Sequence, residues 1–250
     1  MLLAFFIGFG IWNQIGTNQS SIITRIPSLF FCSVSQGVLA SLQTINAFPN
    51  ERAVMLRERA AGSYYVSAYY LSKTIVDFAT NFIIPSIFSI IVYFSIGYQN
   101  TAKNFFTFWI LMLLDTWAAT SVATALSCIC VSLELSTVML SIFFEICRLY
   151  GGFFTSPAQL TGDASGWKFL DVISYIKYVF VGVALNELNG LEFTCSQEEI
   201  SLGQCIHSGA TIIEQKGYGE YSIGYCAGSL VAYIVGVRFI GYLAIRFIKT

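Results

Sequence analysis

The sequence predicts an all-α membrane protein with six transmembrane helices, and composition and segment length both support this fold class. Of the 250 residues, 56% are hydrophobic and only 11% are charged, whereas soluble domains carry about 25% charged residues. The mean hydropathy is +0.68. Apolar segments recur along the chain and alternate with short polar ones, as in multi-pass membrane proteins. The net charge of −1 leaves no basic face, so we expect no nucleic-acid partner.

The first apolar segment, at about 1–15, is shorter than the roughly 20 residues that a spanning helix needs. It lacks the basic n-region and the cleavage site of a signal peptide, so we expect a spanning helix truncated at its N-terminus. The other five spans are expected at about 27–48, 73–98, 105–131, 135–154 and 221–245. Together with an external loop at 155–220, we expect them to form one transmembrane domain over residues 1–250.

A cluster of charged residues separates the second and third spans. Five acidic and basic side chains fall within nine positions there: Glu51, Arg52, Arg57, Glu58 and Arg59. One charge at the centre of a membrane helix costs about 2.5–3.5 kcal/mol, so we expect this segment at the membrane surface. Pro49 is expected to end the preceding span, and Asn50 is expected to cap a short surface helix.

Lys and Arg residues in the short loops predict the orientation of the chain in the membrane. One side carries more of them than the other: Arg52, Arg57, Arg59, Arg246 and Lys249 against Arg25 and Lys103. The positive-inside rule therefore places the 49–65 loop and the C-terminus in the cytosol. It places the 155–220 interval outside, together with the 10–26 loop, in which Asn18 begins the Asn-Gln-Ser sequon of a candidate glycosylation site.

The external 155–220 interval is more than a simple loop. Its segment Trp167–Leu185 is amphipathic or re-entrant in character and too charged to span a membrane. Cys195 and Cys205 lie on the oxidising side, where they are positioned to form a disulfide bond; the alternative is two free or intermolecular thiols. The other five cysteines lie in expected spans, where they behave as small apolar residues.

Motifs of enzyme chemistry are scarce. The chain has no GxxxxGK[ST] phosphate loop, no HExxH and no CxxC pair, and its only histidine is His207, which disfavours a His-based metal site or a serine triad. An intramembrane enzyme would need paired acids, and Asp115 and Glu145 on different spans offer only a weak case. Glu145 and Arg148 either pair with each other or face a cavity. The same question stays open for further charges within or beside spans: Asp115, Lys73 and Asp77.

Several distinctive stretches occur in order along the chain: Glu51–Glu58, Gly62–Tyr65, Ser67–Lys73, Gly151–Phe154, Ser174–Tyr178, Asn186–Gly190 and Phe193–Cys195. This ordered set resembles the transmembrane domain of G-subfamily ATP-binding-cassette (ABC) transporters of the White or half-transporter type, and the resemblance covers essentially the whole chain. It implies the membrane half of an ATP-driven exporter of lipids, sterols or amphipathic small molecules, working as a dimer with alternating access.

The resemblance also implies partners. A nucleotide-binding domain, upstream in cis or in trans, would bind ATP and Mg²⁺, so we expect no cofactor and no enzyme activity in this chain itself. A second half-transporter would complete a homodimer or heterodimer. The other expected partners are a hydrophobic or amphipathic substrate and the lipid bilayer. The expected location is the plasma membrane, with an endomembrane as the alternative. A different function with the same features is a truncated, nontransporting paralogue that pairs with full-length subunits and regulates them.

By position, the resemblance assigns two sets of functional residues. A cytosolic coupling helix against the nucleotide-binding domain, or alternatively a solvated loop, falls on Glu51, Arg52, Arg57, Glu58, Arg59, Gly62 and Tyr64. A substrate cavity between the two halves of the dimer, with an apolar plug above it, falls on Gln36, Leu39, Gln43, Ser141, Phe153 and Phe154. For the two aromatic residues the alternative is core packing. Polar residues of the second span share a sector of about 140°, which favours a cavity-facing side: Ser33, Gln36, Gln43 and Asn46.

Overall fold

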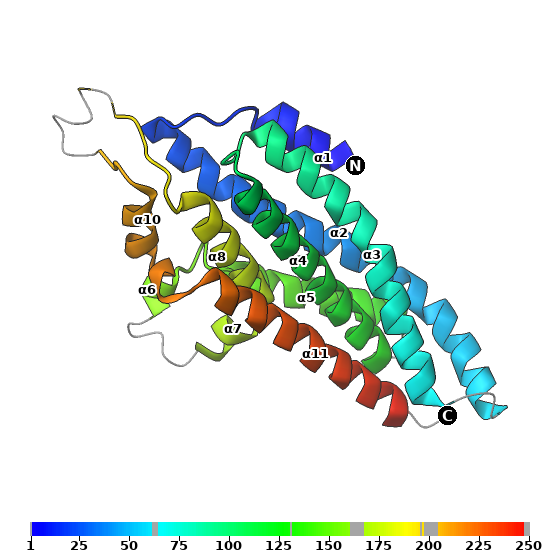
Figure 1. Cartoon of the computed structure of the whole chain (residues 1–250). Coiled ribbons are helices and arrows are strands. Elements are labelled where there is room, and N and C mark those ends of the chain that lie inside the picture. The colour runs from blue at the N-terminus through cyan, green and yellow to red at the C-terminus, as the bar shows by residue number, and fades with distance from the viewer. Residues whose placement is uncertain are drawn as a thin grey trace.

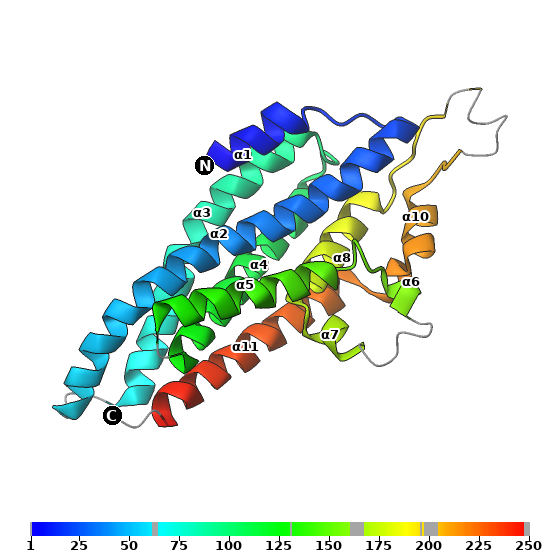
Figure 2. The same cartoon turned by 180° about the vertical axis from the view of Figure 1, so that it is seen from behind.

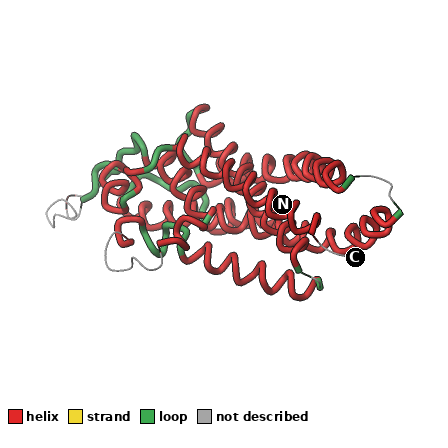
Figure 3. The backbone as a smooth tube through the Cα atoms, turned by 90° about the horizontal axis from the view of Figure 1, so that it is seen from below, coloured by secondary structure: helices red, strands yellow, loops and turns green. Residues whose placement is uncertain are grey.

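The described part of the chain is built of helices, as the all-α fold class predicts. The computed structural model describes residues 2–61, 65–130, 132–160, 168–195, 197 and 205–247, and within these ranges the only β-structure is two isolated bridges. Figure 3 shows helices joined by loops throughout. The long helices run side by side as an elongated bundle (Figure 1): α2 (Gln19–Ala60), α3 (Val66–Ile96), α4 (Ala102–Ile129), α5 (Leu133–Leu149) and α11 (Ile223–Phe247).

Helix α4 lies at the centre of this bundle. It packs against each of the other long helices, and α5 lies beside α2 in the view from behind (Figure 2). Fully buried Ala118, Ala119 and Ala123 present little side-chain volume on α4. Small residues of this kind let helix backbones approach closely in membrane proteins, so α4 serves as the common packing surface.

The expected count of six spans is not confirmed by the described residues. In the part of the chain that the structure describes, four helices have the length and composition to cross a membrane: Gln19–Asn46 within α2, and α3, α4 and α11. The fifth expected span forms α5, which has only 17 residues. The first forms the short helix α1 (Leu2–Phe5) and the π-helix η1 (Phe6–Ile11). Both are shorter than the roughly 20 residues that a bilayer-crossing helix needs.

The predicted helix break at Pro49 is wrong. Helix α2 continues through this position and ends only at Ala60, after 42 residues. A proline removes one backbone hydrogen bond and strains the helix, but neighbouring packing can hold the helix together. Here Met55 supplies that packing, since it is buried against the ends of the other helices in a cluster with Tyr70, Cys128 and Ile245. The charged segment is therefore an extension of α2 rather than a separate helix.

Two opposite ends of the bundle can be recognised. The Met55 cluster brings the end of α2, the start of α3 and the C-terminal end of α11 together, as the predicted topology requires. The other end holds Asn18, which pairs with Thr194 in an isolated bridge. The short helices gather toward this second end (Figure 1): α6 (Pro157–Leu160), α7 (Lys168–Ile173), α8 (Tyr175–Leu188), α10 (Gly209–Lys216) and the 3₁₀-helix η3 (Tyr218–Glu220).

Helix α8 is the most deeply buried of these short helices. Every residue from Tyr175 to Leu188 is buried, because α8 inserts among α2, α4, α5 and α11. Of the two characters expected for Trp167–Leu185, the amphipathic one is wrong for α8, which buries all its faces, and the re-entrant one stays a prediction. Within α8, Glu187 forms a buried ion pair with Arg25 of α2. Arg25 was expected in an external loop, but it lies inside α2 and is only 2% exposed. Its two terminal nitrogens donate to the Glu187 carboxylate and to two loop carbonyls, which offsets the cost of burying the charge.

Candidate functional site

A cavity of about 240 Å³ lies between α2, α3 and α4, with α1 closing one side. Its lining combines amide side chains with apolar ones: Leu3, Gln36, Leu39, Ala40, Gln43, Asn81, Ile84, Pro85, Phe88 and Thr116. A wall that combines apolar surface with polar groups suits small amphipathic molecules. The cavity is therefore the candidate binding site of this chain.

A kink in α3 forms one wall of the cavity. Pro85 has no backbone N–H, so the carbonyl of Asn81, four residues earlier, loses its helical hydrogen bond. Asn81 adopts non-helical dihedral angles (φ −87°, ψ 23°). Its side-chain Nδ2 instead donates to the carbonyl oxygen of Asp77 at 2.8 Å, which stabilises the kink. Pro85 inside the expected span 73–98 is the sequence signal from which this kink, and with it the role of Asn81, could have been predicted.

The residues expected to line a substrate cavity between two halves of a dimer do not all line this cavity within one chain. Gln36, Leu39 and Gln43 of α2 all line the cavity described above. Ser141 does not, since it lies on an exposed face of α5 and its hydroxyl donates to the carbonyl of Thr137. Asn81 and Thr116, which do line the cavity, lie on α3 and α4, where no cavity residue was expected.

Phe153 and Phe154 belong to a separate aromatic cluster at the end of α5. The Phe153 ring stacks on Phe30 of α2 with 4.8 Å between centroids, and Phe154 approaches the same ring edge-on at 5.6 Å. The turn before them is fixed at Gly152, which has a φ of +83° and whose carbonyl accepts a hydrogen bond from the Tyr218 hydroxyl. Burial raises the pKa of the Tyr218 phenol, which keeps this hydroxyl protonated as a donor.

The charged pair of α5 lies on its exposed face. Arg148 and Glu145 contact each other three residues apart, and their side chains are 46% and 58% exposed. Of the two possibilities that the sequence left open, the structure shows lateral pairing. Asp115, by contrast, is fully buried in α4, so the two acids that an intramembrane enzyme would need to pair face different surroundings.

A buried polar network joins α3, α4 and α11. Arg238 of α11 donates to the Asp77 carboxylate of α3 at 2.8 Å and to the Ser121 hydroxyl of α4 at 2.9 Å. Lys73 lies 3.3 Å from the second carboxylate oxygen of Asp77. The role left open for Lys73 and Asp77 is thus ion pairing: with each other within α3, and for Asp77 also across helices with Arg238. Sequence reasoning overlooked Arg238, because its partners lie more than 100 positions away.

The expected coupling segment is only partly described. Its residues Arg57 and Glu58 are exposed on the last turns of α2. Next to them, Met55 and Glu58 line a shallow pocket with Tyr69 and Lys73 of α3. The remaining members of the set lie outside the described residues or have side chains that do: Glu51, Arg52, Arg59, Gly62 and Tyr64. The exposed charges therefore lie at one end of the helix whose middle lines the cavity.

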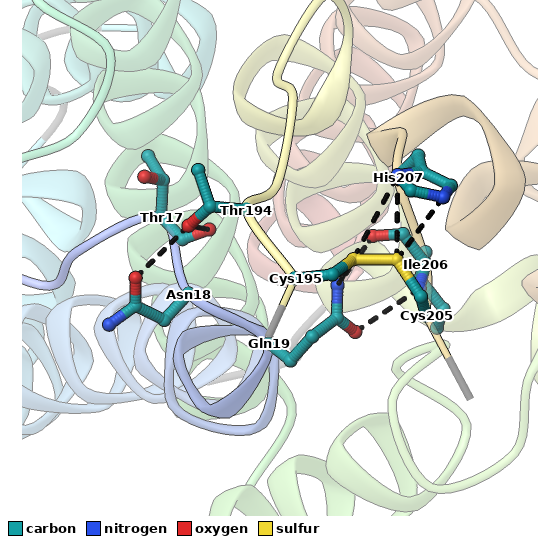
Figure 4. The surroundings of a disulfide bond; sticks show 8 residues. All are labelled: Thr17, Asn18, Gln19, Thr194, Cys195, Cys205, Ile206 and His207. Carbon is teal, nitrogen blue, oxygen red and sulfur yellow. Dashed lines mark hydrogen bonds between the residues drawn. A yellow bond between two sulfur atoms is a disulfide. The ribbon is translucent and has the colours of Figure 1, made fainter. Parts of the chain in front are cut away.

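The structure contains the expected disulfide bond between Cys195 and Cys205, whose Cα atoms are 5.9 Å apart. Figure 4 shows how Gln19 of α2 holds this loop: its Nε2 donates to the Ile206 carbonyl at 2.6 Å, and its Oε1 accepts from the Ile206 N–H at 3.2 Å. The imidazole of His207 lies beside the sulfurs. Asn18 is exposed on the same surface, and its glycosylation stays a prediction.

Comparison with known proteins matches this architecture to one family. Residues 1–188 match the family model described as ABC-2 type transporter. ABC transporter G family member 1 of Dictyostelium discoideum is 25% identical over 94% of this chain and 30% of its own length. ABC transporter G family member 22 of Arabidopsis thaliana is 30% identical over 88% of this chain and 26% of its own length. ABC transporter ATP-binding protein/permease wht-1 of Caenorhabditis elegans is 26% identical over 98% of this chain and 37% of its own length.

The chain thus spans between 26% and 37% of the length of these three relatives, and the aligned part is the membrane domain. The match over residues 1–188 is to a membrane transporter family, which agrees with the helices that can cross a membrane. The cavity lies among these helices. The chain belongs to the ABC-2 type transporter family, as a transmembrane domain related to G-family ABC transporters.

Proposed function

We propose that this chain is the membrane half of an ATP-driven exporter of lipids, sterols or other amphipathic small molecules. The observation that carries the proposal is the continuity of α2, from Gln19 to Ala60. Its exposed end bears Arg57 and Glu58, and its middle bears the cavity residues Gln36 and Gln43. From Gln43 to Glu58 the helix rises about 22 Å, so movement at the charged end carries directly to the cavity.

In this mechanism a nucleotide-binding domain, in cis or in trans, binds ATP with Mg²⁺ and presses on the charged end of α2. The kink at Asn81 gives α3 a point at which to bend when α2 moves. The cavity wall on α3 and the wall on α2 then change their separation. This change switches the cavity between inward-facing and outward-facing states, and Phe153 and Phe154, which pack against Phe30 of α2, form the apolar barrier.

The chemistry of the cavity supports an amphipathic substrate. Gln36, Gln43 and Asn81 supply amide donors and acceptors, whereas Ile84 and Phe88 supply apolar surface. A substrate with a long apolar body and a small polar group satisfies both. A charged substrate is disfavoured, because the ionisable side chains of the neighbouring network are already paired with each other.

The size of the cavity supports a dimer. At about 240 Å³ it is smaller than the roughly 300–1,000 Å³ of sites that enclose drug-sized ligands. Exposed apolar side chains lie on α2, which lines the cavity, and on its neighbour α5: Leu39, Leu42, Val138, Met139 and Ile142. A second half-transporter that packs on this face completes the substrate site and covers the apolar surface. We propose the plasma membrane as its location.

The proposal is tested by transport in inside-out vesicles that contain the full chain with its nucleotide-binding domain. Fluorescent phospholipid, sterol and amphipathic drug probes are offered with ATP and, as the control, with a nonhydrolysable analogue. ATP-dependent accumulation of at least one probe supports an exporter. Active ATPase without transport of any probe class contradicts it and favours a nontransporting regulatory subunit.

A further inference from the structure

Asp115 is a buried acid that neither the cavity nor the coupling segment uses. Buried acidic residues are few in the described chain: Asp77, Asp115 and Glu187. Asp77 contacts Arg238, and Glu187 contacts Arg25. Asp115 is fully buried, and neither of its carboxylate oxygens has a hydrogen-bond partner among the described residues.

The side chain of Asp115 faces a small cradle between three helices. A Cβ atom placed on Gly37 of α2 would lie 3.3 Å from Asp115 Oδ1 and 2.9 Å from the Tyr175 hydroxyl of α8. The two oxygen atoms therefore flank the same point on the surface of α2. The Tyr175 hydroxyl is also fully buried and without a hydrogen-bond partner. Two orphaned polar groups converge here because glycine leaves the space open.

The titratable groups that face this cradle carry no charge to balance a carboxylate. Tyr233 of α11 and Cys147 of α5 lie near Tyr175, and both are neutral in ordinary conditions. The charged groups Asp77 of α3 and Arg238 of α11 are paired with each other, and Arg238 also donates to Ser121 of α4. Ser121 lies six residues beyond Asp115, about 9 Å along the helix. No cation among the described residues contacts the acid.

The electrostatic cost of an unpaired charge determines whether the Asp115 carboxyl group is ionised or protonated. An ionised carboxylate without a partner costs several kcal/mol in a low-dielectric interior, and a buried group of this kind takes up a proton instead. The neutral acid needs only one acceptor for its O–H, and the Tyr175 hydroxyl on the same side of Gly37 is the polar group that a small rotation would bring to it. The proton is thus the ligand that fits the cradle.

We propose that Asp115 is a proton-binding site, which holds its proton while α2, α4 and α8 are packed together and releases it to water when α2 separates. Gln36 and Thr116, which line the cavity, are the chain neighbours of Gly37 and Asp115. Movement of α2 that widens the cavity therefore also opens the cradle. Only this link to the cavity rests on the proposed transport function; the protonation of Asp115 does not.

The proton is detected by infrared spectroscopy of the full chain in lipid nanodiscs. The carbonyl stretch of a protonated carboxylic acid is separate from the bands of a carboxylate. We expect such a band in the wild type at neutral pH, its loss in Asp115→Asn, and its retention in Glu134→Gln, which removes an exposed acid. A spectrum in which Asp115→Asn removes no acid band overturns the proposal.

Thermal unfolding of the same samples gives a second readout. Since a neutral asparagine replaces a neutral acid, we expect Asp115→Asn to fold and to melt within about 3 °C of the wild type. Asp77→Asn, which strips Arg238 of its partner, is expected to melt much lower. In the unfolded wild type Asp115 is exposed to water and ionised, whereas in the folded protein it keeps its proton. The melting temperature of the wild type should therefore fall as the pH rises from about 6 to about 8, and more steeply than that of Asp115→Asn.

An Asp115→Asn protein that fails to fold, or melts as low as Asp77→Asn, would mean that the carboxylate is charged, and this overturns the proposal. Equal pH slopes in the two proteins overturn proton release on opening. Neither readout requires transport. A chain that shows the acid band but moves no substrate therefore refutes the proposed function and leaves the proton site intact.

Discussion

Asp77 of α3 and Arg238 of α11 form a buried ion pair, with 2.8 Å between the carboxylate and the guanidinium, although 161 residues separate them. Ser121 of α4 accepts a second hydrogen bond from the same guanidinium. Asp77 also lies one turn before the kink at Asn81, whose side chain bonds to the Asp77 carbonyl. The pair therefore fixes three helices directly beside the point at which α3 bends.

Replacing Asp77 with asparagine should destabilise the chain strongly. The change leaves the buried Arg238 charge without its partner, which typically costs about 3–5 kcal/mol. Equilibrium unfolding of the full chain in nanodiscs measures the loss. The matched control is Glu145→Gln, which removes the acid of the exposed pair with Arg148 and should cost no more than about 1 kcal/mol. Equal losses in the two variants would refute the structural role of the Asp77 pair.

Filling the cavity should impair transport without unfolding the chain. Ala40 lines the cavity, so Ala40→Phe places a ring in the space proposed for substrate. We expect uptake of bulky amphipathic probes into inside-out vesicles to fall about tenfold, which corresponds to about 1.4 kcal/mol of lost binding. Ala79→Phe adds the same ring at an exposed position of α3 and should transport normally. Equal uptake by both variants would argue against this cavity as the substrate site.

Substitution of Gly37 should separate α2 from its neighbours. An alanine Cβ there meets the Tyr175 hydroxyl at 2.9 Å and the Ala119 Cβ at 3.3 Å, so one of the helices must shift. We expect Gly37→Ala to lower the stability by about 1–3 kcal/mol, as overpacking does. Gly236→Ala is the control, because a Cβ at that helical position meets nothing within 4 Å. A stability of Gly37→Ala at or above that of Gly236→Ala would show that the contact is not tight.

The disulfide bond can be checked without a functional assay. Digestion under non-reducing conditions should yield the Cys195 and Cys205 peptides joined, because Gln19 holds the loop that brings the sulfurs together. Mass spectrometry after alkylation identifies the joined pair. Recovery of both cysteines as alkylated free thiols would contradict the bridge, and the five buried cysteines serve as internal controls for thiol detection.

Hydropathy was sufficient to locate the long helices, because each buries or exposes a whole apolar segment to lipid. Local rules failed where packing overrides them. Pro49 was expected to end a helix, but Met55 packs against three other helices and α2 continues. Arg25 was assigned to a loop because a charge inside a span is costly, and its contact with Glu187, 162 positions away, offsets much of that cost.

The candidate site was predictable in part for the same reason. The polar face of the second span placed Gln36 and Gln43 toward a cavity, since polar groups on one face avoid lipid. The contribution of Asn81 and Thr116 depends on how α3 and α4 pack, which no local pattern contains. Likewise, an acid such as Asp115 can be recognised as unusual from sequence, but its lack of a partner is a property of the fold.

Charge reversal at Glu58 tests whether movement at the charged end of α2 switches the cavity between its inward-facing and outward-facing states. ATP-dependent transport, ATPase activity and surface expression are measured for Glu58→Arg and for Glu134→Arg, which reverses an exposed acid at the start of α5. We predict that Glu58→Arg reaches the surface but loses coupled transport, while Glu134→Arg transports normally. Unimpaired transport by Glu58→Arg would contradict the assignment of α2 as the coupling element.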